Sequence, residues 1–504
     1  MKIKVLAILC MVVMLYSCDT KEAAEMVETM TTVVEDTTTT LEEIPTERVY
    51  YDDVDFPFVL DENVVGTWDV CGYVSEIDDF SNTNIDDEYV LKNLIIHDDG
   101  TCKHIYENDS AVLKWTANAI LDVRNQLTGE YLFKTIGNIE YLFIEWKYAG
   151  YIFTGESEYY VLKKGEPIMI KRFEDIRTNF TRNPWEIKEE EYNFEDIKTY
   201  SYGDDIIIEN NQDYAMEILE NAKDPGLGIR ALHARGITGE GVNVAIIDQE
   251  IVTEKYHPEY DGKIAGHNYF GNYPSTDCGS MHGPAVASLL VGETVGVAPG
   301  AKLYYAGAQS GTGDSQYYAD AIHWIIEENE KLPDGEKIRV VSVSAAPSGE
   351  GSYFEKNLES YTEAVDAAFA AGILVIDCRN GFDSGFISSA YSNGGDINDV
   401  TQYNTGIPNL EPFFRQYYMH VPTSLRTTAG QYSVDDSHYT YWGNGGLSWG
   451  IPYAAGVFAL GWQVNPDLSF IEIYDILFAT AYINEEEARI INPTAFIEYI
   501  EANK

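Results

Sequence analysis

Three side chains whose types can perform nucleophilic catalysis occur along the chain in the order Asp248, His282 and Ser448. Asp248 follows the apolar run 242–247, which predicts a buried strand with the carboxylate at its end. Open α/β sheets hold their functional groups at this carboxyl edge. His282 stands two residues before Pro284, which suits the first turn of a helix, and Ser448 also opens a predicted helix. A serine hydroxyl beside a histidine base and an orienting carboxylate is a constellation that can perform acyl transfer.

Each of these residues also has a purely structural interpretation. Asp248 could cap the turn after its strand, His282 could be a structural histidine, and Ser448 could be a plain N-cap. Their combination is more informative, because Asp, His, Ser is the chain order of the subtilisin triad. The separations here are 34 and 166 residues. We therefore interpret the three positions as parts of one site.

The chain resembles the subtilisin-like (subtilase) serine peptidases over about residues 227–480. Besides the three residue contexts above, the matching segments are 238–242, 296–301 and 465–466. The resemblance implies a serine-type endopeptidase that cleaves protein or peptide substrates through an acyl-enzyme on Ser448. It also implies that the histidine takes the serine proton and that the aspartate fixes the imidazole tautomer.

Further site residues follow from the same resemblance. Asn380 stands where the family places a second donor to the oxyanion, and the alternative is a simple Asn-Gly turn. Ser344, Ala345 and Ala346 follow another predicted strand, where the family places a segment that lines the substrate. Backbone pairing with an extended peptide would take place there.

Several positions around the site depart from the family pattern. Gln249 follows the aspartate, Pro284 follows the histidine helix start, and Leu447 and Trp449 flank Ser448. None of these departures removes a triad group, so we interpret the domain as a divergent but active enzyme. The alternative is a catalytically degenerate, ligand-binding or scaffold lipoprotein.

The elements that must hold these side chains alternate between strand-like and helix-like runs. This alternation predicts an α/β subtilisin-like domain over residues 227–504, with a mainly parallel sheet and helices on both faces. The predicted strands are 242–247, 302–306, 339–344 and 373–376, and the predicted helices are 285–291, 319–328, 361–371 and 451–464.

The preceding region, residues 62–165, has short apolar and aromatic runs separated by turn signals. This pattern predicts a small all-β domain, either a closed barrel or a sandwich. A Gly-Thr-Trp sequence ending at Trp68, with segments 144–147 and 159–162, resembles the lipocalin-like barrels of bacterial envelope proteins. Trp68 and Trp146 could line a ligand pocket, but core packing is the commoner role of such residues. The predicted strands are 64–74, 91–97, 101–106, 131–136, 141–147, 151–154 and 159–163.

The N-terminus predicts the location of the protein. An apolar run too short to span a membrane ends in a sequence that resembles a bacterial lipobox at Cys18. We expect residues 1–17 to be a lipoprotein signal peptide and a lipid on Cys18 to anchor the protein to the membrane outside the cytoplasm. An uncleaved anchor and plain secretion are the alternatives. Residues 18–61 are rich in Thr and Glu and predict a flexible tether, and residues 166–226 predict an acidic connector or pro-like segment.

Composition narrows the set of partners. The chain has 504 residues and a formal net charge of -49, so its field repels phosphate and we expect no nucleic-acid partner. Cys71, Cys102, Cys278 and Cys378 are too few and too scattered for a disulfide scaffold. No zinc motif and no EF-hand-like spacing occurs in the sequence. We expect no required cofactor, although acidic loops could supply ligands to a structural calcium ion.

Overall fold

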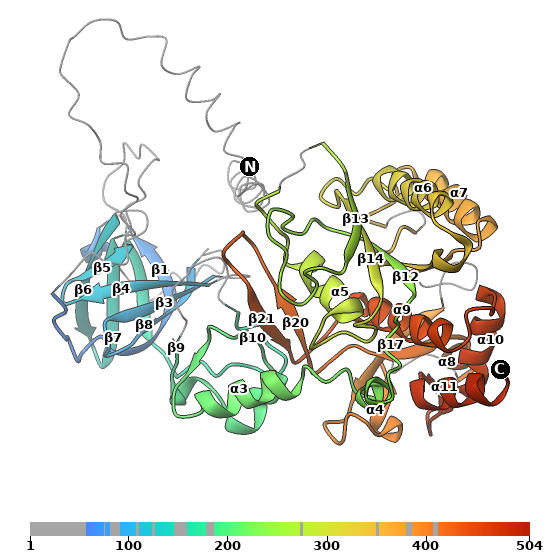
Figure 1. The fold of residues 1–504 in the computed structure, drawn as a ribbon. Coiled ribbons are helices and arrows are strands. Elements are labelled where there is room, and N and C mark those ends of the chain that lie inside the picture. Colours follow the sequence, from blue (N-terminus) through green and yellow to red (C-terminus); the bar gives the residue numbers. More distant parts are fainter. Residues whose placement is uncertain are drawn as a thin grey trace, which may run out of the picture. The chain divides into compact units, whose positions relative to one another are not determined.

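A computed structural model of the chain shows two compact units (Figure 1). Of the described residues, one unit contains those from 57 to Ile170 together with Lys188–Tyr192, and the other contains those from Lys171 to Ile187 and from Asn193 to Lys504. The predicted signal peptide, Cys18 and most of the predicted tether lie outside the described residues. The helices within the described residues are all too short or too polar to span a membrane. The described residues are 57–74, 76–80, 91–106, 110–122, 127–145, 159–177, 186–272, 276–348, 352–379, 386–406 and 412–504.

The first unit is a closed barrel of eight antiparallel strands in sequence order. It closes where β8 pairs with β1, with Asp69 opposite Lys163. A closed barrel leaves no sheet edge exposed, and it is one of the two architectures that the strand pattern predicts. The predicted strand 151–154 lies outside the described residues, and two strands, β4 and β5, were not predicted. The strands are β1 (Gly66–Val74), β2 (Leu91–Ile96), β3 (Thr101–Tyr106), β4 (Ser110–Thr116), β5 (Ala119–Asp122), β6 (Leu127–Ile136), β7 (Ile139–Glu145) and β8 (Tyr159–Lys164).

Two tryptophans fill the core of the barrel. Trp68 and Trp115 are fully buried, and they pack in one cluster with aliphatic side chains of the neighbouring strands. The indole N–H of Trp68 donates to the Val64 carbonyl at 2.7 Å, and that of Trp115 donates to the His97 carbonyl at 2.7 Å. Because both donors are satisfied inside the barrel, the two rings can be buried without an unpaired polar group. Trp146, the other aromatic residue predicted for this domain, lies outside the described residues.

The second unit is built on a five-stranded sheet in the order β13-β14-β12-β15-β16. All neighbouring strands run parallel, so the predicted parallel sheet is confirmed. The register places Asp248 opposite Gly307 and Asp377 opposite Val343, so both carboxylates stand at the carboxyl edge of the sheet. The strands are β12 (Asn243–Asp248), β13 (Ile264–Phe270), β14 (Lys302–Ala308), β15 (Ile338–Val343) and β16 (Leu374–Asp377).

Helices cover both faces of this sheet, as predicted (Figure 1). Successive side chains of a strand point to opposite faces. In β12, Val244 and Ile246 pack into the core beneath α5 and α9, whereas Ala245 and Ile247 pack into the core beneath α6 and α7. This two-sided burial explains why β12 is continuously apolar. The helices are α5 (His282–Val291), α6 (Gln316–Lys331), α7 (Leu358–Ala370) and α9 (Leu447–Val464).

The second unit also includes residues that we assigned to a connector. Strand β10 pairs with β21, with Ser201 opposite Trp442, and Tyr202 is fully buried between them and α3. Segments 171–187 and 193–226 therefore pack as part of the same compact unit as the parallel sheet. The other elements of this unit are β9 (Glu186–Ile187), β10 (Ser201–Gly203), β11 (Ile207–Ile208), α3 (Gln212–Asn221), α4 (Ile229–Ala234), β17 (Ile387–Ser392), β18 (Tyr403–Thr405), α8 (Pro412–Tyr417), β19 (Met419–Pro422), β20 (Arg426–Gly430), β21 (His438–Trp442), α10 (Phe470–Thr480), β22 (Tyr482–Ile483), β23 (Arg489–Ile490) and α11 (Pro493–Ala502).

Candidate active site

Asp248 and His282, which are 34 residues apart in the sequence, meet at the carboxyl edge of the sheet. The His282 Nδ1 and Asp248 Oδ1 atoms are 2.6 Å apart. Asp248 is the last residue of β12 and is only 3% exposed, and its Oδ1 also accepts the backbone N–H of Gln249 at 2.7 Å. A carboxylate held by two donors in this way orients the imidazole and leaves Nε2 as the other ring nitrogen for chemistry.

Burial and the Asp248 carboxylate together determine the protonation behaviour of His282. Burial opposes the charged imidazolium, but the charge of Asp248 and its hydrogen bond together outweigh burial, so the pKa of His282 is raised. Such a shift makes the neutral imidazole a stronger base toward a hydroxyl proton. This is the property that a general base in acyl transfer requires.

Ser448 is the second residue of α9, whose N-cap is Gly446. Its Oγ donates to the Ser344 carbonyl at 3.4 Å, and the Ser344 Oγ donates to the Ser448 carbonyl at 2.9 Å. No hydrogen bond joins Ser448 to His282 in the described part of the structure. The adjacent residue, Trp449, does contact His282, because the two ring centroids are 5.1 Å apart. All three predicted residues are therefore in one region of the unit, with the serine bonded to backbone.

The predicted substrate segment lies beside this serine. Ala345, directly after Ser344, accepts the backbone N–H of Cys378 at 2.9 Å, so the ends of β15 and β16 are tied together next to Ser448. The Cys378 thiol also interacts with the Ser448 side chain, and burial raises the pKa of that thiol. Ala346 is half-buried. Asn380 lies outside the described residues, so its predicted role in the oxyanion hole stays a prediction.

A buried ion pair occupies the stretch just before Asn380. The Asp377 carboxylate accepts from Arg379 Nε at 2.7 Å and from the Tyr361 hydroxyl at 2.9 Å. Burial raises the pKa of Asp377, and the Arg379 charge opposes this shift. Neither Asp377 nor Arg379 was predicted from the sequence to belong to a site. Its partner Tyr361 lies on α7 and could not be identified from the local sequence.

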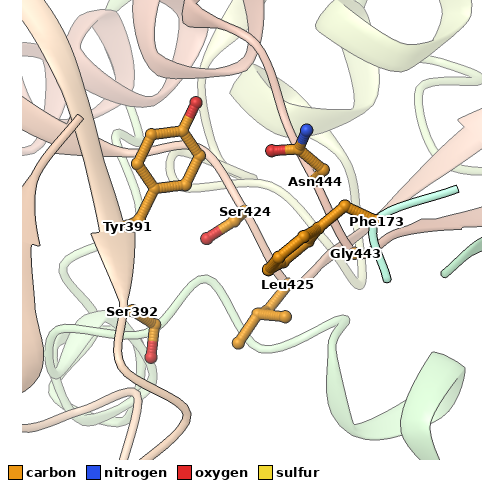
Figure 2. A pocket seen from close by; sticks show the side chains of 7 residues that line it. All are labelled: Phe173, Tyr391, Ser392, Ser424, Leu425, Gly443 and Asn444. Atoms are coloured by element: carbon orange, nitrogen blue, oxygen red, sulfur yellow. The ribbon is translucent and has the colours of Figure 1, made fainter. Parts of the chain in front are cut away.

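A small cavity lies in the same unit, near the loop that leads to Ser448. It measures about 280 Å³ and includes Asn444, four residues before Ser448. Figure 2 shows the side chains that line it, among them the Phe173 ring from the segment that precedes β9. The described residues contain no group of three or more His, Cys, Asp or Glu side chains that could hold a metal ion. No structural calcium site is assigned among these residues. The lining residues are Phe173, Tyr391, Ser392, Ser424, Leu425, Gly443 and Asn444.

A parallel sheet with a buried Asp–His pair at its carboxyl edge and a serine at a nearby helix start defines a serine hydrolase type of site. Residues 239–395 match the model of the subtilase family, Peptidase S8. The C-terminal part of the chain thus contains a region that matches the subtilase family. The matched range includes Asp248 and His282 and ends before Ser448.

Curated relatives agree with this assignment. The chain is 30% identical over 263 residues to M-protease of Shouchella clausii (strain KSM-K16). The aligned region covers 50% of this chain and 62% of the relative. It is 29% identical over 263 residues to Subtilisin Savinase of Lederbergia lenta, and here the aligned region covers 50% of this chain and 87% of the relative. The chain thus spans less than two thirds of M-protease. These relatives and the family match support a serine-type endopeptidase.

The solved structure of fervidolysin from Fervidobacterium pennivorans, a keratinolytic enzyme related to subtilisin, is also similar. It is 18% identical, with a TM-score of 0.41, and the match covers 54% of this chain and 45% of that chain. This likeness is too weak to carry an argument. The fold assignment rests on the strand order and the family match.

Proposed function

We propose that the chain is a serine endopeptidase that hydrolyses peptide bonds through an acyl-enzyme on Ser448. The observation that carries the proposal is the contact between His282 Nδ1 and Asp248 Oδ1, at 2.6 Å, in a buried position at the carboxyl edge of the sheet. A histidine whose Nδ1 is held by a buried carboxylate presents Nε2 as a base. The subtilase family match supports the same chemistry.

In the proposed reaction, His282 Nε2 takes the proton of the Ser448 hydroxyl while Oγ attacks the carbonyl carbon of the substrate. The resulting imidazolium then gives this proton to the leaving amine as the peptide C–N bond breaks. Water hydrolyses the acyl-enzyme by the same sequence, with the histidine again acting first as base and then as acid. These proton transfers use side chains of the chain alone.

One movement is required before this reaction can start. Ser448 Oγ donates to the Ser344 carbonyl, and a rotation about the Ser448 Cα–Cβ bond would release it toward His282. Catalytic hydrogen bonds are often long or misdirected before substrate binds, and they tighten in the substrate complex. Because Ser448 begins an 18-residue helix, backbone N–H groups and the positive end of its dipole would face a developing oxyanion. We assign the second oxyanion donor to Asn380.

We further propose that a lipid on Cys18 anchors the enzyme to the membrane outside the cytoplasm. The apolar run and lipobox-like sequence at the N-terminus support this location. The Thr- and Glu-rich segment up to residue 61 would then act as the tether. The closed eight-stranded barrel would be a lipocalin-like domain between the tether and the peptidase, and the position of Trp68 in its core is compatible with this assignment.

A fluorophosphonate probe tests the peptidase proposal, because it reacts with serines that an adjacent base activates. We expect the purified wild type to be labelled, Ser448→Ala to be unlabelled, and His282→Ala to be labelled far more slowly. Ser437→Ala is the matched control, since Ser437 is an exposed serine of the same unit. Absence of label on the folded wild type, or full labelling of Ser448→Ala, would contradict the proposal.

The alternative function is an inert, ligand-binding or scaffold lipoprotein. The bond from Ser448 Oγ to the Ser344 carbonyl favours it, because it directs the hydroxyl away from the histidine. The two functions differ in one measurable way. An inert domain leaves a peptide library uncleaved, whereas an active enzyme produces new N-termini that disappear in His282→Ala.

A further inference from the structure

An indole ring packs against the His282 ring. The ring centroids of His282 and Trp449 are 5.1 Å apart, and their planes are inclined by 32°. Trp449 is 4% exposed and is the third residue of α9, directly after Ser448. Asp248 holds the edge of the same imidazole through Nδ1. Asp248 thus holds one edge of the His282 ring, and Trp449 packs against the same ring.

Trp449 also packs against a second indole ring. Its centroid lies 5.1 Å from that of Trp442, which is anchored by an indole N–H bond to Thr428 Oγ1 at 2.8 Å. The Arg177 guanidinium lies over the Trp442 ring, 4.1 Å from its centroid. Trp449 therefore has ring contacts with both Trp442 and His282. Packing on both sides gives Trp449 little freedom to move away from His282.

We propose that Trp449 is a positioning residue that holds the plane of the His282 ring for proton transfer and stabilises its imidazolium form. This inference rests on the proposed function. The physical basis is the negative face of the indole, which attracts a cation within about 6 Å of the ring centroid, and Trp is the strongest aromatic side chain in this respect. During turnover above the His282 pKa, the imidazolium forms when His282 takes the Ser448 proton. The attraction therefore lowers the energy of the charged stage more than that of the resting stage.

The charged surroundings of His282 make the effect of Trp449 measurable. Asp248, from β12, is the charged group that interacts with the imidazole within the described residues. Tyr305, Tyr318 and Cys378 interact with Asp248 from the neighbouring strands and α6, and burial raises the pKa of each, so they stay neutral at pH 7. Relief of burial on substitution of Trp449 would raise the pKa of His282, so a fall in that pKa reports the loss of the indole.

The experiment compares Trp449→Met, Trp449→Phe and Trp462→Leu with the wild type. Methionine fills space without an aromatic face, and phenylalanine restores a weaker one. Trp462 is the matched control. It lies thirteen residues beyond Trp449 on the same helix, it is also buried, and its ring contacts Phe458 instead of His282. NMR titration of His282 gives its pKa without any need for turnover. The pH dependence of kcat and KM on a peptide substrate gives the second readout.

In Trp449→Met we expect the His282 pKa to fall by about 0.5 to 1.5 pKa units, and kcat to fall roughly 3- to 30-fold at nearly constant KM. Trp449→Phe should recover part of both losses, and Trp462→Leu should change neither. If Trp449→Met does not fold, a lowered His282 pKa in Trp449→Phe still supports the inference. An unchanged His282 pKa and kcat in the folded Trp449 variants would overturn it.

The same data separate this inference from the proposed function. A wild type that cleaves no peptide, while the NMR shift on Trp449 substitution is present, rejects the peptidase proposal and leaves the indole–imidazole interaction supported. An active wild type with no NMR shift rejects the interaction and leaves the peptidase proposal supported. The two readouts therefore fail independently.

Discussion

Substitution of Asp248 by asparagine tests the proposed proton relay most directly, because it removes a charge and almost no volume. The carboxylate is 3% exposed and accepts hydrogen bonds from His282 Nδ1 and from the Gln249 N–H at its Oδ1 atom. In Asp248→Asn the Gln249 N–H still requires an acceptor, so the amide oxygen can stay there and the amide NH₂ can turn toward His282. The imidazole would then carry its proton on Nε2, where it cannot accept one from Ser448.

The expected loss in kcat is about 10³- to 10⁴-fold, which corresponds to roughly 4 to 5.5 kcal/mol of transition-state stabilisation. A second effect concerns pH. The Asp248 charge raises the pKa of His282 against the opposing effect of burial, so its removal leaves burial alone and lowers this pKa. The acid limb of the residual pH–rate profile should therefore move to lower pH in Asp248→Asn.

Stability should change with pH in a defined direction. Because the folded-state pKa of His282 lies above its unfolded value of 6.5, the pair stabilises the folded chain fully below that pH. This contribution is lost as pH rises through the folded-state pKa. The Tm difference between the wild type and Asp248→Asn should therefore be larger at pH 5 than at pH 8.

Steady-state kinetics on a peptide substrate between about pH 5 and 9 would measure the loss in kcat and the shift of the acid limb. The Tm of each variant, recorded over the same pH range, would measure the change in stability. Asp366→Asn is the matched control, since Asp366 is exposed on α7 and should change neither quantity. The reasoning is refuted if Asp248→Asn, while folded, retains activity within about 10-fold of the wild type. An acid limb that moves to higher pH would refute the electrostatic part of the argument.

Two further predictions concern the scaffold around the site. Burial raises the pKa of Glu259, but hydrogen bonds from Thr294 and Tyr439 outweigh burial and lower this pKa below 4.5. The Glu259 carboxylate therefore stabilises the folded chain above that pH, and this stabilisation is lost as pH falls through the folded-state pKa. Glu259→Gln should therefore cost about 1 to 3 kcal/mol at pH 7 and less at pH 4, as measured by urea unfolding; equal costs at both pH values would contradict this. Tyr202→Ala should lower the free energy of unfolding by about 3 kcal/mol, because the Tyr202 ring is fully buried. Tyr499 is half-exposed, so Tyr499→Ala should lower it little. Comparable unfolding midpoints for the two variants would show that segment 193–226 does not stabilise the peptidase unit.

The sequence predicted most of the fold because its signals are local. The run 242–247 became β12 with a one-residue shift, and His282 and Ser448 lie at the starts of helices as expected. Two barrel strands escaped prediction. The turn between them carries Asn118 at a positive φ of 71° rather than the expected glycine, so no turn signal separates β4 from β5.

Edge strands were also difficult to predict. Strand β13 contains Gly266 and several polar side chains, and it pairs on one side only, with β14. A strand at the edge of a sheet need not be apolar on both faces, so it lacks the continuous hydrophobic run that identified β12. Its existence depends on the neighbour it pairs with, which no local window of sequence contains.

By itself, the sequence determined which residues are candidates for the chemistry, the order Asp248, His282, Ser448, and the alternation of strands and helices that brings them to one edge of a sheet. Only the tertiary structure decided that the Ser448 hydroxyl bonds to the Ser344 carbonyl, that Trp449 packs against the imidazole, and that segment 193–226 packs into the same unit as the parallel sheet. The physical reason is range. Periodicity and turn chemistry act between near neighbours in the chain, whereas side-chain direction and ring stacking are set by close packing among segments that are distant in sequence.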